Sequence, residues 1–494
     1  MMKRSPCKRT EARCHRAEGP SAHDIALTIL PALLAAGLFS ACAAVGPDYR
    51  AQRIAAPAAW RADMTAGLAA ETVNPDTSAQ WWRQLGDPGL SALIEQVSAA
   101  NMDLRSARAR LLEARARRAM AGAALLPAVG ASVTGRRSSG TPGARSSNTL
   151  YAAGFDASWE LDIFGATRRS VEAAQADLEA DAALLDWTRV SLVAEAALNY
   201  IEVRTLQVRL GIGLRNLASQ SETLQLTEWR SQAGLVGSLD VEQARTNLEQ
   251  TRAQLPRLEI SLAEAHNRLL ILSGQQPGAP SSNLARPGAI PVPPHHVAVG
   301  IPADALRRRP DVRAAERRLA AETARLGQAQ AARFPGVGLS GSIGLESLTL
   351  GKLLDGTVTR SFAASLGSTI FDAGRLAQQV RAQDAVRAQA LIAFQASVLA
   401  ALGDVENALV SFARSRERET ALAAAAAAAR NAALLARDRY TSGLIDFQTV
   451  LDTERTVLSI EDNLAGAQAD GTSAVIRLYK ALGGGWSPAR GEIP

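Results

Sequence analysis

Two stretches of the sequence repeat the same pattern, and their spacing decides the fold. The first is NMDLRSARARLLEARARRAMAGAALLPAVGASVTG, Asn101–Gly135, and the second is PDVRAAERRLAAETARLGQAQAARFPGVGLSGS, Pro310–Ser342. They align without a gap about 208 residues apart, and with drifts of one residue the match continues to Gly234 against Gly443. This period lies far beyond the ~20 to 50 residues of solenoid and propeller repeats. The sequence therefore predicts a duplicated, domain-sized unit whose two copies build one pseudo-symmetric body.

Each copy contains two segments in which apolar and polar residues alternate, and we expect strands at about 127–137, 149–164, 335–347 and 359–371. The pattern is clearest from Leu150 to Phe164, where the apolar set is Tyr151, Phe155, Trp159, Leu161 and Ile163 and the polar set is Gly154, Asp156, Ser158, Glu160 and Asp162. A period of two indicates β-strands with one apolar face. Each segment is long enough to cross a bilayer when tilted, since ~9 to 11 residues suffice.

The stretches between paired strands, Arg136–Thr149 and Ser347–Thr359, are rich in Ser, Gly, Thr and Pro and are expected to be hairpin loops. A soluble antiparallel sheet is the alternative interpretation of the alternation. In a membrane, however, four strands cannot close a barrel, and an open edge leaves backbone groups unpaired in hydrocarbon. Lipid-facing strands therefore imply several chains sharing one barrel.

Long helical patterns surround these strands. We expect helices at about 88–126, 165–230 and 238–272 in the first copy and at about 303–333, 373–440 and 447–482 in the second. A helix of ~60 residues is a rod of roughly 90 Å, too long for a globular core. Heptad spacing at Leu391, Val398, Val405 and Phe412 calls for partner helices, which the returning helices can supply. A proline-rich linker, 275–302, joins repeat 1, 88–274, to repeat 2, 303–483, and a tail follows at 484–494.

The amino terminus has the pattern of an export signal, 1–41. Basic residues precede an almost wholly apolar run, Ile25 to Phe39, and small residues lead to Cys42. A retained membrane anchor is the alternative, but the run is short and contains Pro31. Ser40-Ala41-Cys42 resembles the bacterial lipoprotein cleavage box, which implies a covalent lipid on Cys42, the only cofactor that we expect. Residues 42–87 would then form a lipid-anchored, extended segment.

Composition weighs against nucleic-acid binding and catalysis. Net charge is +6, and aromatic residues make up only 4% of the chain. The two densest basic stretches, Arg105–Arg118 and Arg307–Arg318, contain no interleaved aromatic residues of the kind that stack on nucleic-acid bases. They are better explained as solvated helix faces. The five histidines lack metal-ligand spacing, and Gly483-Gly484-Gly485 follows a helix instead of leading from a strand into one. We therefore expect no metal, no catalytic residues and no nucleic-acid partner.

Several long motifs, in order, resemble the outer-membrane factor (TolC-like) family, in its NodT-like lipoprotein branch that serves RND-type efflux pumps. They are CAAVGPDY (Cys42–Tyr49), WWRQLGDPGLSALI (Trp81–Ile94), RRRPDVRAAERRLAAETARLGQAQAARFP (Arg307–Pro335), RYTSGLIDFQTVLD (Arg439–Asp452) and LYKALGGGW (Leu478–Trp486). The resemblance implies a mainly α protein with transmembrane β-strands. It also implies a homotrimer with a 12-stranded outer-membrane barrel and a 12-helix periplasmic tunnel, met by a periplasmic membrane-fusion adaptor and an inner-membrane RND pump.

The resemblance also points to residues at the two helix turns. Adaptor contact through a repeated Arg-x-x-x-Gly motif would use Arg230, Gly234 and Leu235 in the first copy and Arg439, Gly443 and Leu444 in the second. The alternative is a plain capping turn with an arginine near a helix C-terminus, where it favours the dipole.

Acidic residues just past these turns resemble the ring that closes the aperture in this family. They are Asp446 and Asp452 in the second copy and Asp240 near the corresponding region of the first. Acids that stabilise a solvated helix start are the alternative.

Two other functions remain open at this point. A lipid-anchored periplasmic coiled-coil scaffold without a pore shares the signal, Cys42 and the long helices, but gives no reason for strands with acids on one face. A type I secretion outer-membrane factor is closer, and the lipoprotein box and LYKALGGGW favour the RND branch over it.

Overall fold

The computed structural model describes residues 44–52, 56–72, 74–139, 147–279, 284 and 286–486, which divide into two compact units. One unit holds residues 44–46 with Ala124–Arg169 and Gly327–Gln378, and contains a four-stranded sheet. The other holds the remaining described residues and is mostly helical. The predicted signal peptide, Cys42 and most of the predicted tail lie outside the described residues.

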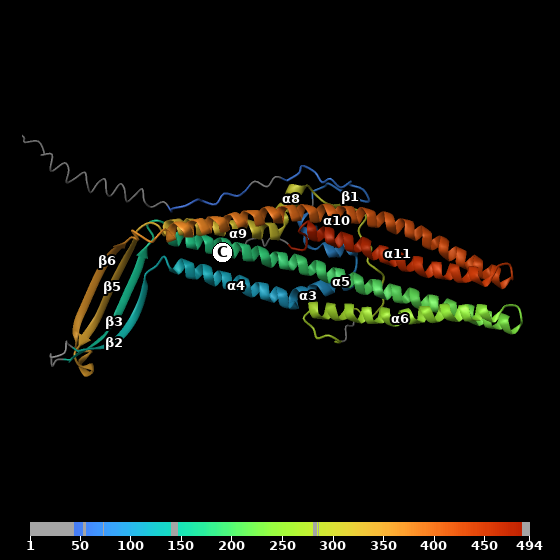
Figure 1. The fold of residues 1–494 in the computed structure, drawn as a ribbon, viewed down its shortest axis with the longest axis horizontal. Helices are drawn as coiled ribbons and strands as arrows, with labels where there is room; N and C mark the ends of the chain where they lie inside the picture. Colours follow the sequence, from blue (N-terminus) through green and yellow to red (C-terminus); the bar gives the residue numbers. More distant parts are fainter. Residues whose placement is uncertain are drawn as a thin grey trace, which may run out of the picture. The chain divides into compact units, whose positions relative to one another are not determined.

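The sheet is antiparallel throughout and has the order β2-β3-β5-β6 (Figure 1). Its strands are β2 (Ala128–Ser139), β3 (Ser147–Leu161), β5 (Gly336–Ser347) and β6 (Thr357–Gly367). All four strands are thus where the alternation predicts them, but their bounds differ. The first hairpin loop is shorter than expected because β2 and β3 extend into it, and the second contains a 3-10 turn, Leu350–Lys352.

Two predicted strand ends are wrong, since Ile163-Phe164 and Ile370-Phe371 lie outside β3 and β6. The physical reason is helix capping. The carboxylate of Asp162 accepts hydrogen bonds from the backbone N–H groups of Thr167 (3.0 Å) and Arg168 (2.7 Å), so the chain leaves the sheet to begin a helix. In the second copy Asp372 does the same for Leu376 at 2.8 Å.

The strand register gives the sheet one apolar and one polar face. Phe155 pairs with Ile343, Trp159 with Leu339, and Val337 with Leu366, so apolar positions of neighbouring strands share a face. That face also carries Val129, Val133, Tyr151, Leu345, Val358 and Phe362. The opposite face carries Ser132, Thr134, Asp156, Ser158, Glu160, Ser340, Ser342, Glu346, Thr359, Ser361 and Ser365. Val133 and Phe362 are 75% and 78% exposed within one chain, which leaves a broad apolar surface uncovered.

The helical unit repeats one plan twice. In the first copy α3 (Pro88–Ala100) and α4 (Met102–Ala123) precede the strands, and α5 (Ala166–Gln232) and α6 (Ser238–Leu272) follow them. In the second copy the elements are α8 (Pro302–Arg308), α9 (Pro310–Ala331), α10 (Arg375–Thr441) and α11 (Phe447–Ala481). In Figure 1 each of the two longest helices, α5 and α10, runs beside the helix that returns from its turn.

The helices predicted at 88–126 and 303–333 are each interrupted once, at equivalent places. Asn101 ends α3, and its side-chain oxygen accepts from the N–H groups of Asp103 (2.8 Å) and Leu104 (3.0 Å) to begin α4. In the second copy Pro310 disfavours helical geometry at Arg309, so α8 ends there and α9 begins. The linker is also not purely irregular, because β4 (Val297–Ala298) pairs in parallel with β1 (Leu68–Ala69).

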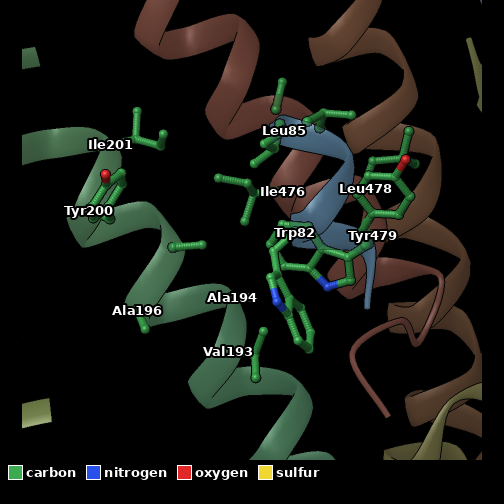
Figure 2. Close-up of a cluster of buried hydrophobic side chains, with 14 of the residues drawn as sticks. Trp82, Leu85, Val193, Ala194, Ala196, Tyr200, Ile201, Ile476, Leu478 and Tyr479 are labelled. Atoms are coloured by element: carbon green, nitrogen blue, oxygen red, sulfur yellow. The ribbon is translucent and has the colours of Figure 1, made fainter. Parts of the chain in front are cut away.

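The largest of several hydrophobic clusters joins the short elements to the long helices. Trp81 in the 3-10 helix η1 (Trp81–Leu85) stacks on Tyr479 of α11 with ring centroids 5.4 Å apart. Figure 2 shows Trp82 and Leu85 together with Val193 and Tyr200 of α5 and Ile476 and Leu478 of α11. The apolar residues of the motifs WWRQL and LYKAL are therefore packing residues.

Candidate functional site: the two helix turns

The two turns that reverse the long helices have the same backbone. Gly234 has φ +74° and Gly443 has φ +73°, the left-handed region that favours glycine. The N–H of Leu235 bonds to the carbonyl of Arg230 (2.9 Å), and the N–H of Leu444 bonds to that of Arg439 (2.8 Å). This hydrogen bond from the residue after the glycine closes a helix C-terminus. As a result Leu235 and Leu444 project outward and are 67% and 73% exposed.

The arginines before these turns are held differently. The Nη1 atom of Arg230 donates to the carbonyl oxygen of Tyr440 at 2.6 Å, and its Cζ lies 4.5 Å from the centre of that tyrosine ring. Arg230 thus binds the last carbonyls of α10, where a cation is favoured. Arg439 is exposed and its side chain makes no hydrogen bond or ion pair with any residue in the described ranges.

Tyr440 anchors a small apolar cluster behind the second turn. Its ring is 2% exposed, lies 5.4 Å from the ring of Phe447, and packs with Ala244, Val450 and Leu451. Tyr440 is not among the residues predicted from the sequence. The sequence signal for it is an aromatic residue directly before the second turn, at the position where the first copy has Ser231.

The acids beyond the turns also differ. Asp446 is the N-cap of α11, and its carboxylate accepts from the N–H (3.0 Å) and the hydroxyl (2.6 Å) of Thr449. These hydrogen bonds hold the pKa of Asp446 below its ordinary value. Asp452 accepts from the side-chain amide of Gln448 at 2.9 Å. Asp240 lies in the first turn of α6, which begins at Gly237 without a side-chain cap.

A buried polar contact, which the sequence pattern does not predict, joins α5 to α11 behind the turns. The hydroxyl of Thr223 donates to Glu454 at 2.6 Å, and both residues are buried. Burial raises the pKa of Glu454, although the hydrogen bond from Thr223 and the charge of Arg437 oppose that shift. Nearby, Gln220 is 2% exposed and no described residue bonds its side-chain amide.

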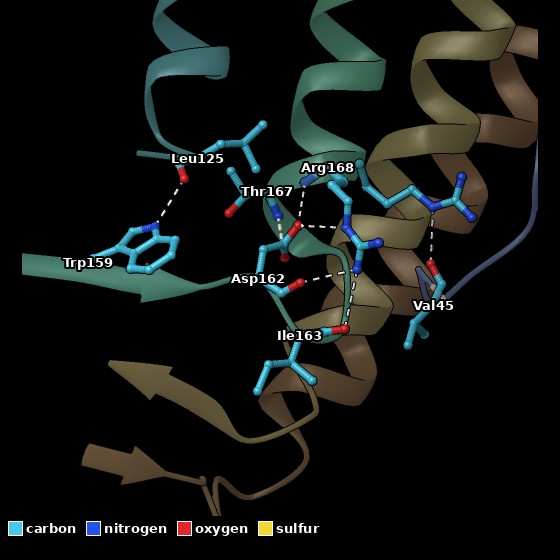
Figure 3. A network of polar contacts seen from close by, with 8 residues as sticks. Val45, Leu125, Trp159, Asp162, Ile163, Thr167 and Arg168 are labelled. Atoms are coloured by element: carbon cyan, nitrogen blue, oxygen red, sulfur yellow. Dashed lines mark hydrogen bonds and ion pairs between the residues drawn. The ribbon is translucent and has the colours of Figure 1, made fainter. Parts of the chain in front are cut away.

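A second polar cluster lies where β3 leads into α5 (Figure 3). Arg168 forms an ion pair with Asp162 (3.2 Å) and donates to the carbonyl of Ile163, while Trp159 donates its indole N–H to the carbonyl of Leu125. The segment after Cys42 is fixed here as well. The N–H of Val45 bonds to the carbonyl of Phe164 (3.0 Å), and Arg169 donates to the carbonyl of Val45 (3.2 Å).

A sheet with one apolar and one polar face, continuous in sequence with two helices of 67 residues, fits the class of membrane channel subunits. The chain belongs to the outer membrane efflux protein family, whose model matches it twice, over residues 93–275 and 301–484. It is therefore an outer-membrane channel component of an efflux system. The double match also agrees with the duplication read from the sequence.

Individual relatives support this assignment. The chain is 32% identical to Nodulation protein T of Rhizobium leguminosarum bv. trifolii, over 91% of this chain and 96% of that protein. It is 32% identical to the pyoverdine export outer membrane protein OpmQ of Pseudomonas putida, over 88% of this chain and 94% of that one. The solved structure of the outer-membrane channel OprN superposes with a TM-score of 0.84 at 36% identity, covering 90% of this chain and all of that one.

The structure thus brings the predicted turn residues of each copy into one compact turn. It ties Arg230 to α10 and leaves Arg439 exposed, and the adaptor and gate roles of both sets stay predictions.

Proposed function

We propose that three copies of this chain close one passive channel through the outer membrane, anchored by a lipid on Cys42, and that the channel serves an RND-type efflux pump. The observation that carries the proposal is the pair of open sheet edges. Strands β2 and β6 each have one neighbour in the described chain, and between them lies a face that is apolar on every strand. An open edge in hydrocarbon leaves backbone groups unpaired, so further copies have to complete the sheet.

The helical unit supports the same conclusion independently. Side-chain contacts place four of its helices in the order α4, α5, α9 and α10. Arg118 of α4 contacts Gln175 of α5, Arg317 of α9 contacts Glu179 of α5, and Gln383 of α10 contacts Glu322 of α9. The outer members are α4, which leads into β2, and α10, which follows β6. Both expose large apolar side chains, namely Met102, Leu112 and Met120 on α4 and Ile392, Leu399 and Val410 on α10. The most apolar window of α10 is only 17% buried, as expected of a helix that packs on a neighbouring copy.

The polar face of the sheet suits a water-filled bore. It carries Ser, Thr and Gly with Asp156, Glu160 and Glu346, the composition expected of the lumen side of a barrel strand. Export would then be driven by the pump, and this chain would supply the path without catalysing a reaction.

The lipid anchor fits the packing of the residues that follow Cys42. Val45 is hydrogen-bonded to Phe164 and Arg169, and a Cβ on Gly46 would lie 2.4 Å from the Cα of Gly327. This point is the end of the sheet that leads into the helices, and Cys42 precedes Val45 by three residues in the sequence. A diacylglycerol on Cys42 can therefore enter the membrane leaflet at that end.

The exposed turns are where an adaptor would bind. We assign Arg439 and the projecting Leu235 and Leu444 to the adaptor contact, with Gly234 and Gly443 shaping the turns. Arg230 supports the second turn from within the chain. Asp446, Asp452 and Asp240 would line the closed mouth, where repetition over three copies brings like charges together and favours cations.

One experiment tests the face assignment with adjacent residues. In proteoliposomes, Val133→Arg puts a charge on the lipid face and costs up to ~2–4 kcal/mol near mid-bilayer, so assembly should be lost, whereas Thr134→Arg on the bore face should assemble and conduct. The mass of the detergent-extracted particle, three chains for the wild type, and planar-bilayer conductance report the outcome. A solitary, soluble wild-type chain, or equal tolerance of both variants, would refute the channel.

The anchor is tested separately on the same particle. Mass spectrometry of the mature chain should find a diacylglycerol on its first residue, Cys42, and Cys42→Ser should abolish that modification. An unmodified wild-type cysteine would refute the anchor and leave the channel standing.

A further inference from the structure

An arginine of β6 lies on the apolar face of the sheet. Arg360 of β6 pairs with Ile343, which pairs with Phe155, so its side chain is on the face that those residues share. Its neighbours on that face along β6 are Val358 and Phe362, both exposed. The side chain of Arg360 is exposed and makes no hydrogen bond or ion pair with any part of the chain that the structure describes. A cation in apolar surroundings needs a counter-charge.

That counter-charge cannot come from the same face. Over the strand positions given by the register, this face has no Asp or Glu, since Asp156, Glu160 and Glu346 all lie on the opposite face. Its other charged residue is a second arginine, Arg137, near the hairpin end of β2. In the proposed trimer β6 of one copy meets β2 of the next, and β2 also has no Asp or Glu on this face.

The position along the strand identifies the ligand. Arg360 is three residues into β6 from Thr357, about 10 Å from the hairpin end at ~3.3 Å per residue. The opposite end of the sheet leads into the helices and follows Cys42, so the hairpin end faces the exterior. Long arginine side chains extend from an apolar surface toward the headgroups. There the phosphates of the outer leaflet supply anions that a guanidinium binds through two parallel hydrogen bonds.

We propose that Arg360 binds a phosphate group of lipid A in the outer leaflet, at the seam between neighbouring copies. This inference rests on the proposed trimeric channel. It makes each seam a lipid-binding site, in which a phosphate supplies the counter-charge that Arg360 lacks on its own face.

The test uses the full-length trimer in neutral detergent, with lipid A as the probe and native mass spectrometry as the readout. The wild type should bind lipid A in preference to dephosphorylated lipid A and to phosphatidylcholine. Arg360→Leu should weaken binding by roughly tenfold, the ratio that ~1.4 kcal/mol gives. Arg360→Lys, which keeps the charge but not the fork, should retain part of the affinity. Arg136→Leu is the matched control, since Arg136 pairs with Leu150 on the opposite face and its loss should leave lipid binding unchanged.

Each outcome decides one statement. Equal lipid A binding by the wild type and Arg360→Leu overturns the inference. Complete displacement of the lipid by millimolar inorganic phosphate also overturns it, because the site then binds a free anion. If Arg360→Leu fails to assemble, the comparison of Arg360→Lys with the wild type decides. A wild type that neither trimerises nor conducts refutes the channel itself, whereas a conducting trimer indifferent to lipid A refutes only the lipid site.

Discussion

The two helix turns share a backbone but differ in what holds them. Both use a left-handed glycine and the same closing hydrogen bond. Only the second is supported from the other repeat, by Arg230, and only the second has a buried tyrosine behind it and an aspartate that caps its returning helix. The first turn has Ser231 and Gly237 at the equivalent positions and lacks those supports.

This difference shows what duplication preserves. The turn backbone depends on glycine and helix geometry, so both copies keep it. The side chains around the turns have diverged, and Arg230 of the first copy now stabilises the turn of the second. Arg439 has no partner among the described residues and is therefore accessible to another protein. Separating the two turns would have to break the contact between Arg230 and the end of α10.

Removing Tyr440 should give the largest effect on this asymmetry. Tyr440→Ala empties a buried aromatic site, and such truncations cost about 3–5 kcal/mol. Hydrogen exchange at the last turn of α10 and the first turn of α11 should therefore accelerate strongly. Ser231→Ala, at the equivalent place in the first copy, should leave exchange at the first turn nearly unchanged.

Tyr440→Phe removes the hydroxyl and keeps the ring, so it measures the contribution of the hydroxyl alone. No described residue bonds that buried hydroxyl, so removing it should be neutral or slightly stabilising. A loss as large as that of Tyr440→Ala would show that the hydroxyl, and not the packed ring, holds the turn.

The arginines provide the next largest contrast. Arg230→Ala removes a charged hydrogen bond to the Tyr440 carbonyl and should cost roughly 1.5–3 kcal/mol of local stability. Arg439→Ala is a surface change and should stay within about 0.5 kcal/mol. We expect the opposite order for adaptor affinity, which surface plasmon resonance on the immobilised trimer measures. Arg439→Ala should lose affinity for the adaptor, although its hydrogen-exchange pattern stays that of the wild type. Unchanged adaptor affinity in Arg439→Ala would remove the role proposed for that residue.

Glu454 adds a pH dependence to the second copy. Its pKa is raised in the folded state, so the folded state binds the proton more tightly than the unfolded one does. Stability should then fall as pH rises from the ordinary glutamate pKa of 4.5 through the raised value, and stay lower above it. Glu454→Gln keeps an acceptor for Thr223 and removes the titration.

Urea midpoints of the wild type and Glu454→Gln between pH 4 and 8 measure this effect. The equivalent residue in the first copy, Arg245, is exposed and paired with Glu242, so Arg245→Gln should leave the slope in place. An identical pH slope in the wild type and Glu454→Gln would assign the dependence to other groups.

Most of the architecture could be predicted because it is encoded in repetition. Alternation locates four strands, absence of proline locates α5 and α10, and glycines mark both turns. What the sequence could not predict depends on single side chains that compete with a periodic pattern. Asp162 and Asp372 end the strands early by capping helices, and Asn101 interrupts a helix that periodicity continues.

The site shows the same division. The turn residues follow from a repeated motif, so sequence alone could list Arg230 and Arg439 together. Their different partners depend on which residue of the other copy lies across the turn, and that is tertiary information. Arg360 is a similar case, since its alternation is weak and the pairing with Ile343 is what places it on the apolar face.

Exchanging the caps of the two returning helices should give the smallest effect and the most direct comparison. Asp446→Ala removes the acceptor for Thr449 and should speed hydrogen exchange in the first turn of α11. Because the pKa of Asp446 is lowered in the folded state, its contribution is present above the ordinary aspartate value of 3.8 and is lost as pH falls through the folded value.

Gly237→Asp should do the reverse for α6. Gly237 has φ −83° and ψ 163°, a conformation open to any residue, and a Cβ there meets no atom closer than 3.9 Å. A side-chain cap in place of glycine should therefore add a few tenths of a kcal/mol and slow exchange in the first turn of α6. If Gly237→Asp instead destabilises that turn, crowding of its carboxylate with Asp240 outweighs the cap. The first copy would then have kept glycine to limit negative charge at the mouth.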